Sequence, residues 1–247
     1  NFNGLIPADF SQISVGATFL DHNAGNNRLA TLNISASGAY AHNYRFSGQS
    51  TAFAHITPRT VTVSAAGGVS KVYDGTKAMT GVTLSLEGQI EGDELTVSGQ
   101  GAFNSANVGT DLPFTLSNLV LGGADAANYQ FAGGGTTISG NTGVITARPL
   151  HVRFSGLDRV YDGTTNADLV VLSDDRIAGD ALSINIAPNA GLFADKHVLR
   201  DPVTGDVLAK PIISVASGSL TLGGAAAGNY TLVANTTGLR ARILPAA

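Results

Sequence analysis

The residues best suited to chemistry are an aspartate and a tyrosine that occur side by side in two copies. The pentapeptide Val72-Tyr73-Asp74-Gly75-Thr76 returns unchanged as Val160-Tyr161-Asp162-Gly163-Thr164. A carboxylate next to a phenol could hold a cation, but one carboxylate per copy is too few for calcium, which needs several oxygen ligands. We therefore expect a structural turn, in which the aspartate accepts backbone amides, the glycine takes a left-handed conformation and the tyrosine packs its ring.

Other acidic residues and the histidines also give no clear site. The acidic residues form two loose clusters, Glu87, Glu91, Asp93 and Glu94, and then Asp174, Asp175 and Asp180. A solvated loop is the favoured interpretation of each cluster, and a weak cation site at one end of a repeat is the alternative. The five histidines neither recur at equivalent positions nor show the spacing of metal ligands.

Catalytic and cofactor motifs are missing from the sequence. There is no Gly-x-Ser-x-Gly nucleophile turn, no glycine-rich loop ending in Lys-Ser/Thr, and no cysteine for thiolate or zinc chemistry. We predict no catalytic residue, no metal site and no cofactor. An enzyme, such as a glycan hydrolase with two carboxylates in one groove, ranks last among the functional hypotheses.

The elements that must position these residues are repeated along the chain. The acids Asp9, Asp93 and Asp180 precede Phe19, Phe103 and Phe193, and each phenylalanine is followed by an asparagine–tyrosine pair ending at Tyr44, Tyr129 or Tyr230. This self-similarity predicts a partial first repeat over residues 1–59 and two complete repeats over 60–148 and 149–247. The first repeat lacks the Tyr-Asp-Gly element, so an initial strand is expected ahead of it, and the third has an insertion near 199–210.

The pattern within each repeat predicts strands. Thr60–Ser64, Val82–Leu86, Leu95–Ser98 and Ser219–Leu222 alternate aliphatic and hydroxyl residues, which is typical of half-buried antiparallel strands. Glycine runs separate them, and no segment of helical length has a 3.6-residue period. The asparagine–tyrosine pairs resemble a tyrosine corner. Together these features predict an all-β chain of antiparallel, immunoglobulin-like sandwiches, with a β-grasp-like fold carrying one short helix near 124–128 as the alternative.

The links between repeats and the composition add further expectations. Pro58 and Pro149 restrict the chain where repeats meet, which predicts a semi-rigid rod. Charged residues make up 13% of the chain and the net charge is -4, so nucleic acid is not an expected partner. No apolar run is long enough to span a bilayer. The lack of cysteine suits a protein exported as an unfolded chain and motivates an extracellular location.

The combined motifs resemble a known family of repeats. They are Val-Tyr-Asp-Gly-Thr, Gly-Asp, Asn107-Val108-Gly109, Leu-x-Gly-Ala before Asn-Tyr, and Ile-Thr-x-Arg-Pro-Leu. This pattern is similar to the YDG-type repeats of large bacterial surface exoproteins, found in filamentous-haemagglutinin-like adhesins that Gram-negative bacteria export by two-partner secretion. The resemblance implies a secreted, surface-attached adhesin and an outer-membrane transporter as a partner during export.

Two functional hypotheses follow for this segment. The first is a structural and adhesive stalk that serves cell–cell, biofilm-matrix or host attachment, in which multiplicity raises avidity. The second is a binding module whose end loops, especially the insertion near 199–210, hold a polysaccharide or a host or bacterial surface protein. In both, the residues Tyr73, Asp74, Gly75, Tyr161, Asp162, Gly163, Tyr44, Tyr129 and Tyr230 preserve architecture.

Overall fold

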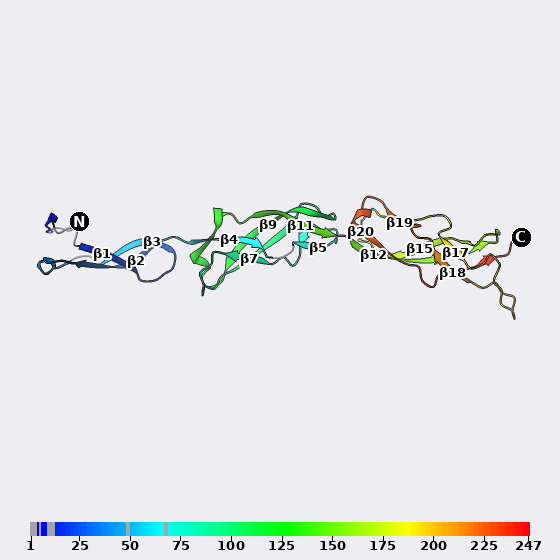
Figure 1. The fold of residues 1–247 in the computed structure, drawn as a ribbon, viewed down its shortest axis with the longest axis horizontal. Helices are drawn as coiled ribbons and strands as arrows, with labels where there is room; N and C mark the ends of the chain where they lie inside the picture. The colour runs from blue at the N-terminus through cyan, green and yellow to red at the C-terminus, as the bar shows by residue number, and fades with distance from the viewer. Residues whose placement is uncertain (1–3, 5, 9–12, 48–49, 67–68) are drawn as a thin grey trace. The chain divides into compact units, whose positions relative to one another are not determined.

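The alternation of side chains leads to an all-β structure (Figure 1). The computed structural model describes residues 4, 6–8, 13–47, 50–66 and 69–247, and Asp9 lies outside them. Among the described residues, helix occurs only as short 3-10 turns, none of which is long or apolar enough to cross a membrane. The short helix considered near 124–128 is one such turn, η3 (Ala126–Asn128).

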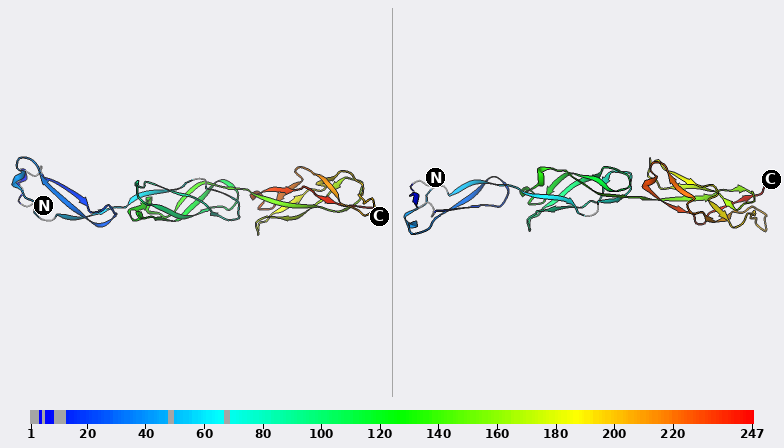
Figure 2. Two further views of the ribbon diagram at one scale, coloured as in Figure 1. Left: turned by 90° about the horizontal axis from the view of Figure 1, so that it is seen from below. Right: turned by 45° about the horizontal axis from the view of Figure 1, so that its top comes forward.

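The first repeat contains one three-stranded antiparallel sheet. Its strands are β1 (Ile13–Phe19), β2 (Gly25–Ala36) and β3 (Thr51–Ile56), in the order β1-β2-β3. Ile13 lies opposite Ala36, and Phe19 lies opposite Ala30. The three strands lie side by side in every view (Figures 1 and 2), and the turn η2 (Ala41–Asn43) lies between β2 and β3 in the chain. Consequently β3 is an edge strand.

The second repeat forms two sheets. A three-stranded sheet has the order β10-β4-β7, from β4 (Arg59–Ala65), β7 (Leu84–Glu87) and β10 (Tyr129–Phe131). A five-stranded sheet has the order β5-β11-β9-β8-β6, from β5 (Ser70–Val72), β6 (Ala78–Met79), β8 (Thr96–Phe103), β9 (Gly109–Gly122) and β11 (Ile138–Thr146). The turns are η3 and η4 (Ala132–Gly134).

The third repeat follows the same plan, but its larger sheet is divided into shorter strands. One sheet has the order β15-β12-β20, from β12 (Arg148–Gly156), β15 (Leu169–Asp174) and β20 (Tyr230–Asn235). A second has the order β14-β17-β18-β21, from β14 (Asn166–Ala167), β17 (Gly191–Phe193), β18 (Lys210–Val215) and β21 (Arg240–Ala241). The pairs are β13 (Arg159–Val160) with β22 (Ile243–Leu244), and β16 (Ser183–Ile186) with β19 (Leu220–Gly223); the turn η5 covers Ala227–Asn229.

Strand direction corrects the expectation of purely antiparallel pairing. In the second repeat β4 pairs parallel with β10, and β5 pairs parallel with β11. In the third repeat β12 pairs parallel with β20, and β13 pairs parallel with β22. Each of these pairs joins a strand from the start of a repeat to one from its end, and such distant strands need no hairpin between them. Side-chain alternation is the same for both directions, so it does not reveal the difference.

The chain divides into two compact units. One comprises Asn1–Gly67, Val82–Gln100 and Leu116–Ile138, and the other comprises Gly68–Gly81, Gly101–Thr115 and Ser139–Ala247. The second repeat therefore contributes residues to both units, and its strands β8 and β9 run from one unit into the other. Each inter-repeat contact described below lies within a single unit.

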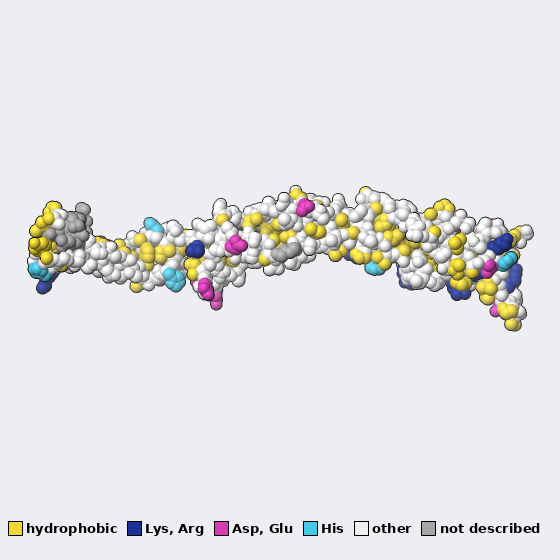
Figure 3. Space-filling model, in the orientation of Figure 1, with side chains coloured by type: hydrophobic (Ala, Val, Ile, Leu, Met, Phe, Trp, Pro, Cys, Tyr) yellow, Lys and Arg dark blue, Asp and Glu magenta, His cyan; other side chains and the backbone are white. Residues whose placement is uncertain are grey.

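The cores are built from the alternate residues of the strands. In β4 the side chains of Val61 and Val63 are buried, and in β12 those of Leu150, Val152 and Phe154 are buried, while the residues between them are not. Strand β4 confirms the half-buried pattern predicted for Thr60–Ser64, and β12 has the same pattern. Among the described residues of the first repeat only Ala30 is a buried hydrophobic residue. Hydrophobic side chains reach the surface in many places, whereas charged groups are scattered (Figure 3).

Leu150 provides a test of the core in the second unit. Its side chain is 0% exposed in the central strand of the β15-β12-β20 sheet. Leu150→Ala should lower the free energy of unfolding by about 2 to 5 kcal/mol, because the change removes buried methyl groups and leaves a cavity. Urea unfolding followed by circular dichroism measures the loss. The exposed Leu172 is the matched control, and an equal loss in Leu172→Ala would contradict the assignment.

Candidate functional site

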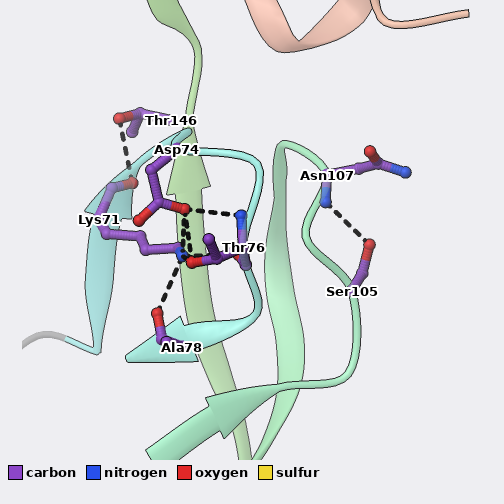
Figure 4. A network of polar contacts seen from close by, with 7 residues as sticks. All are labelled: Lys71, Asp74, Thr76, Ala78, Ser105, Asn107 and Thr146. Carbon is purple, nitrogen blue, oxygen red and sulfur yellow. Dashed lines mark hydrogen bonds and ion pairs between the residues drawn. The ribbon is translucent and has the colours of Figure 1, made fainter. Parts of the chain in front are cut away.

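The Tyr-Asp-Gly-Thr motif forms a tight turn in both copies, as predicted. Asp74 Oδ1 accepts the Thr76 amide at 2.9 Å and the Thr76 hydroxyl at 2.9 Å (Figure 4). In the second copy Asp162 Oδ1 accepts the Thr164 amide at 2.8 Å and the Thr164 hydroxyl at 2.9 Å. These bonds from the amide two residues on are those of an Asx turn.

Glycine is required in these turns because of its backbone angle. Gly75 has φ 77° and Gly163 has φ 81°, both in the left-handed region that side chains with a Cβ disfavour. The prediction that these glycines supply a left-handed residue is confirmed. The repeated pentapeptide thus sets the direction of the chain as it leaves β5 and β13.

A basic residue just before each motif holds the turn from the side. Lys71 Nζ donates to Asp74 Oδ1 at 2.7 Å, to the Thr76 carbonyl at 2.7 Å and to the Ala78 carbonyl at 2.9 Å (Figure 4). In the third repeat Arg159 occupies this place, donates to the Thr164 carbonyl at 2.6 Å and forms an ion pair with Asp162. The Arg159 guanidinium and the Thr164 amide lower the pKa of Asp162 from 3.8 to about 2.

The tyrosines of the asparagine–tyrosine pairs are held by a second repeated turn. The Tyr129 hydroxyl donates to Asp93 Oδ2 at 2.5 Å and accepts the Ile90 amide at 2.9 Å. The Tyr230 hydroxyl donates to Asp180 Oδ2 at 2.6 Å and accepts the Ile177 amide at 2.9 Å. Each phenol therefore uses both its donor and its acceptor capacity.

The first repeat retains part of this arrangement. The Tyr44 hydroxyl accepts the Ile6 amide at 3.4 Å, and Ile6 precedes Asp9 with the spacing of Ile90 to Asp93. The tyrosine-corner interpretation is thus matched by a hydroxyl that ties down a loop in all three repeats. The role of Asp93 and Asp180 as acceptors of these hydroxyls was not predicted. The sequence analysis assigned both residues to solvated acidic clusters.

Asp180 receives a further phenol from the preceding repeat. The Tyr73 hydroxyl donates to Asp180 Oδ2 at 3.0 Å and lies 3.2 Å from Oδ1. The rings of Tyr73 and Tyr230 meet edge to face, with centroids 5.5 Å apart. Aromatic pairs favour this geometry, and buried phenols favour a polar partner. The partner predicted for the Tyr73 hydroxyl thus lies in the next repeat.

An asparagine completes the contact between the second and third repeats. Asn229 Oδ1 accepts the Val108 amide at 2.9 Å, and Asn229 Nδ2 donates to Asn107 Oδ1 at 3.0 Å. The loop that presents Asn107 is fixed by Ser105 Oγ, which accepts the Asn107 amide at 3.0 Å (Figure 4). We refer to Tyr73, Asn107, Val108, Asp180, Asn229 and Tyr230 as the second inter-repeat contact.

The same asparagine contact occurs between the first and second repeats. Asn128 Oδ1 accepts the Ala24 amide at 2.8 Å, and Asn128 Nδ2 donates to Asn23 Oδ1 at 3.3 Å. Asp21 Oδ1 accepts the Asn23 amide at 2.9 Å, as Ser105 does for Asn107. We refer to Asn23, Ala24 and Asn128 as the first inter-repeat contact. The sequence analysis noted Asn128 as part of an asparagine–tyrosine pair but did not identify Asn23 as its partner.

Tyr161 and the remaining acids have other surroundings. The Tyr161 amide donates to the Leu244 carbonyl at 2.8 Å, and its side chain is half-buried. In the acidic clusters, Asp174 pairs with Arg176 and Asp175 pairs with His151 at 3.0 Å. Within the described part of the chain, no three carboxylate or imidazole groups come together in a way that could hold a metal ion.

Loss of Asp180 should cost more stability than loss of Asp93. Asp180→Ala leaves two buried phenols, Tyr73 and Tyr230, without their acceptor, whereas Asp93→Ala leaves only Tyr129 without one. Each unsatisfied hydroxyl should cost about 1 to 3 kcal/mol. Chemical denaturation of both variants gives the comparison. Equal losses would show that the Tyr73 bond contributes nothing.

The phenols also predict instability at alkaline pH. Burial, and then hydrogen bonding to Asp180, raises the pKa of Tyr73 and of Tyr230 above 10.0; burial and Asp93 do the same for Tyr129. Because the folded chain holds these protons more tightly, their stabilising effect is complete below about pH 10 and is lost as pH rises through the folded pKa values.

Absorbance of tyrosinate against pH tests this prediction. Tyr73, Tyr129 and Tyr230 should titrate above 10, and Tyr73→Phe should remove one late-titrating phenol. The free energy of unfolding should decline over the same range. An unchanged number of late-titrating phenols in Tyr73→Phe would refute the assignment.

Comparison with known proteins agrees with the repeated geometry. A family model described as the YDG domain matches residues 57–138 and again residues 146–238. No curated protein and no solved structure matches the chain. The two matched stretches cover more than half of the sequence and contain both copies of the Tyr-Asp-Gly-Thr turn and both complete tyrosine–aspartate pairs. The chain therefore belongs to the YDG domain family.

Proposed function

We propose that this chain is a structural and adhesive stalk segment of a secreted bacterial surface adhesin. The observation that carries the proposal is the recurrence of one contact chemistry between successive repeats. Asn128 binds Asn23 and Ala24, and Asn229 binds Asn107 and Val108, through the same pair of hydrogen bonds. A spacer built from copies needs such a recurrent connection, because each repeat must meet its neighbour in the same way.

The organisation that we infer for the stalk has three repeats, over residues 1–59, 60–148 and 149–247. Each complete repeat would be an immunoglobulin-like sandwich, a class of fold built from two packed sheets. The tyrosines, asparagines and aspartates that the repeats share form the turns and the inter-repeat contacts. This supports an architectural role for them. In this proposal many repeats act together, so that weak individual contacts add up to strong attachment through avidity.

The cellular setting is part of the same proposal. The YDG resemblance favours export from a Gram-negative cell through an outer-membrane transporter and a final position at the cell surface. The lack of cysteine is compatible with passage as an unfolded chain. Antibodies raised against the 247 residues would label intact cells of the source bacterium, and labelling only after permeabilisation would exclude this location.

A second candidate function is binding through the insertion near 199–210. Asp201 Oδ1 accepts the amides of Val203 at 2.8 Å and Thr204 at 3.0 Å, and Arg200 forms a bridge with Val207. This ordered hairpin presents Val203 with 91% of its surface exposed. Binding residues are often carried on projecting surface loops of this kind.

One exchange experiment separates the stalk from the binding module. In the gene that encodes the chain, residues 149–247 are replaced by a second copy of residues 60–148, which lacks the insertion. A stalk predicts that biofilm formation and cell attachment stay within about twofold of the unaltered strain, since the copy restores a repeat. A binding module predicts loss of attachment, reproduced by the single change Val203→Lys. Loss in the exchange strain together with retention in a Val203→Lys strain would contradict both.

A further inference from the structure

We propose that a pocket in the first unit, beside Asp93 and Tyr129, binds an added β-strand of the type Val-Tyr-Asp-Gly-Thr. The strand would come from outside residues 1–247, and its tyrosine would enter the pocket. The proposal rests on matching positions in the two units and does not depend on the adhesive function.

The pocket has a volume of about 430 Å³. Its lining includes Thr57, Ile90, Asp93 and Tyr129, together with His22 and Arg59, all within the first unit. Pockets of this size accommodate a side chain or a small ligand, and a few convergent polar groups give them specificity. Here the convergent groups are the Asp93 carboxylate and the Tyr129 hydroxyl.

Four of these lining residues have counterparts in the second unit, and each counterpart touches the segment that contains Tyr73. Asp180, the counterpart of Asp93, accepts the Tyr73 hydroxyl, and Tyr230, the counterpart of Tyr129, packs against its ring. The second unit therefore shows what fills the equivalent space: a tyrosine from the preceding repeat.

The other two counterparts touch the backbone of the same segment. Thr146, the counterpart of Thr57, accepts the Tyr73 amide through its carbonyl at 2.9 Å. A Cβ placed on Gly75 would lie 3.4 Å from Cγ2 of Ile177, the counterpart of Ile90. The pocket wall thus fits both the side chain and the main chain of a Tyr-Asp-Gly segment.

The strand β3 offers a backbone edge that leads to this pocket. Its counterparts β11 and β22 each pair parallel with a strand that ends just before the tyrosine, β5 and β13 respectively. In the described part of the first repeat, β3 is at the edge of the β1-β2-β3 sheet, with a strand on one side only. An open strand edge is a template for an added strand, and neighbouring pockets select its side chains.

Asp93 has the capacity to bind the incoming phenol. Its Oδ2 accepts the Tyr129 hydroxyl, and no described residue donates to its Oδ1. In the second unit the equivalent carboxylate of Asp180 accepts two phenols, one from its own repeat and one from the preceding repeat. The first unit therefore has one of the two phenols and the space for the other.

A peptide titration tests the proposal on the whole chain. A synthetic peptide with the sequence of residues 70–79, Ser-Lys-Val-Tyr-Asp-Gly-Thr-Lys-Ala-Met, is added to the isotope-labelled protein, and amide resonances are followed by NMR. We expect saturable shifts at Ile56, Thr57 and Ile90. A peptide with phenylalanine in place of tyrosine should bind about tenfold more weakly, as expected for one lost hydrogen bond to a charged group.

Two further arms make the outcome decisive. A peptide with alanine in place of tyrosine should give no shift at Ile90. The protein variant Asp93→Asn should reduce the difference in affinity between the tyrosine and phenylalanine peptides, because a neutral amide oxygen accepts the phenol hydroxyl more weakly than a carboxylate does. The matched control is Asp206→Asn, an exposed acid of the third repeat. The proposal fails if no binding occurs up to about 1 mM peptide, if the alanine peptide binds equally well, or if the shifts fall at Thr146 and Asp180 because the peptide displaces β5.

Discussion

The hydrogen bond between a buried tyrosine hydroxyl and an aspartate is the interaction on which the rest of the architecture depends. Tyr129 and Tyr230 each begin a strand that pairs parallel with the first strand of the same repeat. The hydroxyl also accepts an isoleucine amide, so it fixes the loop that precedes the acid. One side chain thereby sets the start of a strand, the position of a loop and the place where a neighbouring repeat makes contact.

The same geometry shows which groups the aspartates and tyrosines of the repeated motifs bind. Asp180 accepts two phenols whose pKa values are raised by burial and by the carboxylate itself, so the protons stay on the phenols at neutral pH. The acids of the Tyr-Asp-Gly-Thr turns are bound to backbone amides and to Lys71 or Arg159. The negative charge of each aspartate therefore stabilises the closed turn.

Local features were predictable from the sequence, and long-range pairing was not. The alternation of Val61 and Val63 identified a half-buried strand, and the Asx turn at Asp74 followed from the residue types. Strand direction was not encoded in the alternation, which is why the parallel pairs were missed. The hydrogen bond from Tyr73 to Asp180 joins two repeats. The sequence around either residue gives no sign that the other is its partner.

The asparagine contacts bear on how such a chain changes over evolutionary time. Asn128 and Asn229 each bind an asparagine side chain and the following amide of the preceding repeat. Since donor and acceptor are alike at both places, recombination that deletes or duplicates one whole copy would join ends that still fit. The number of repeats can then differ between strains without any change in the residues that join one repeat to the next.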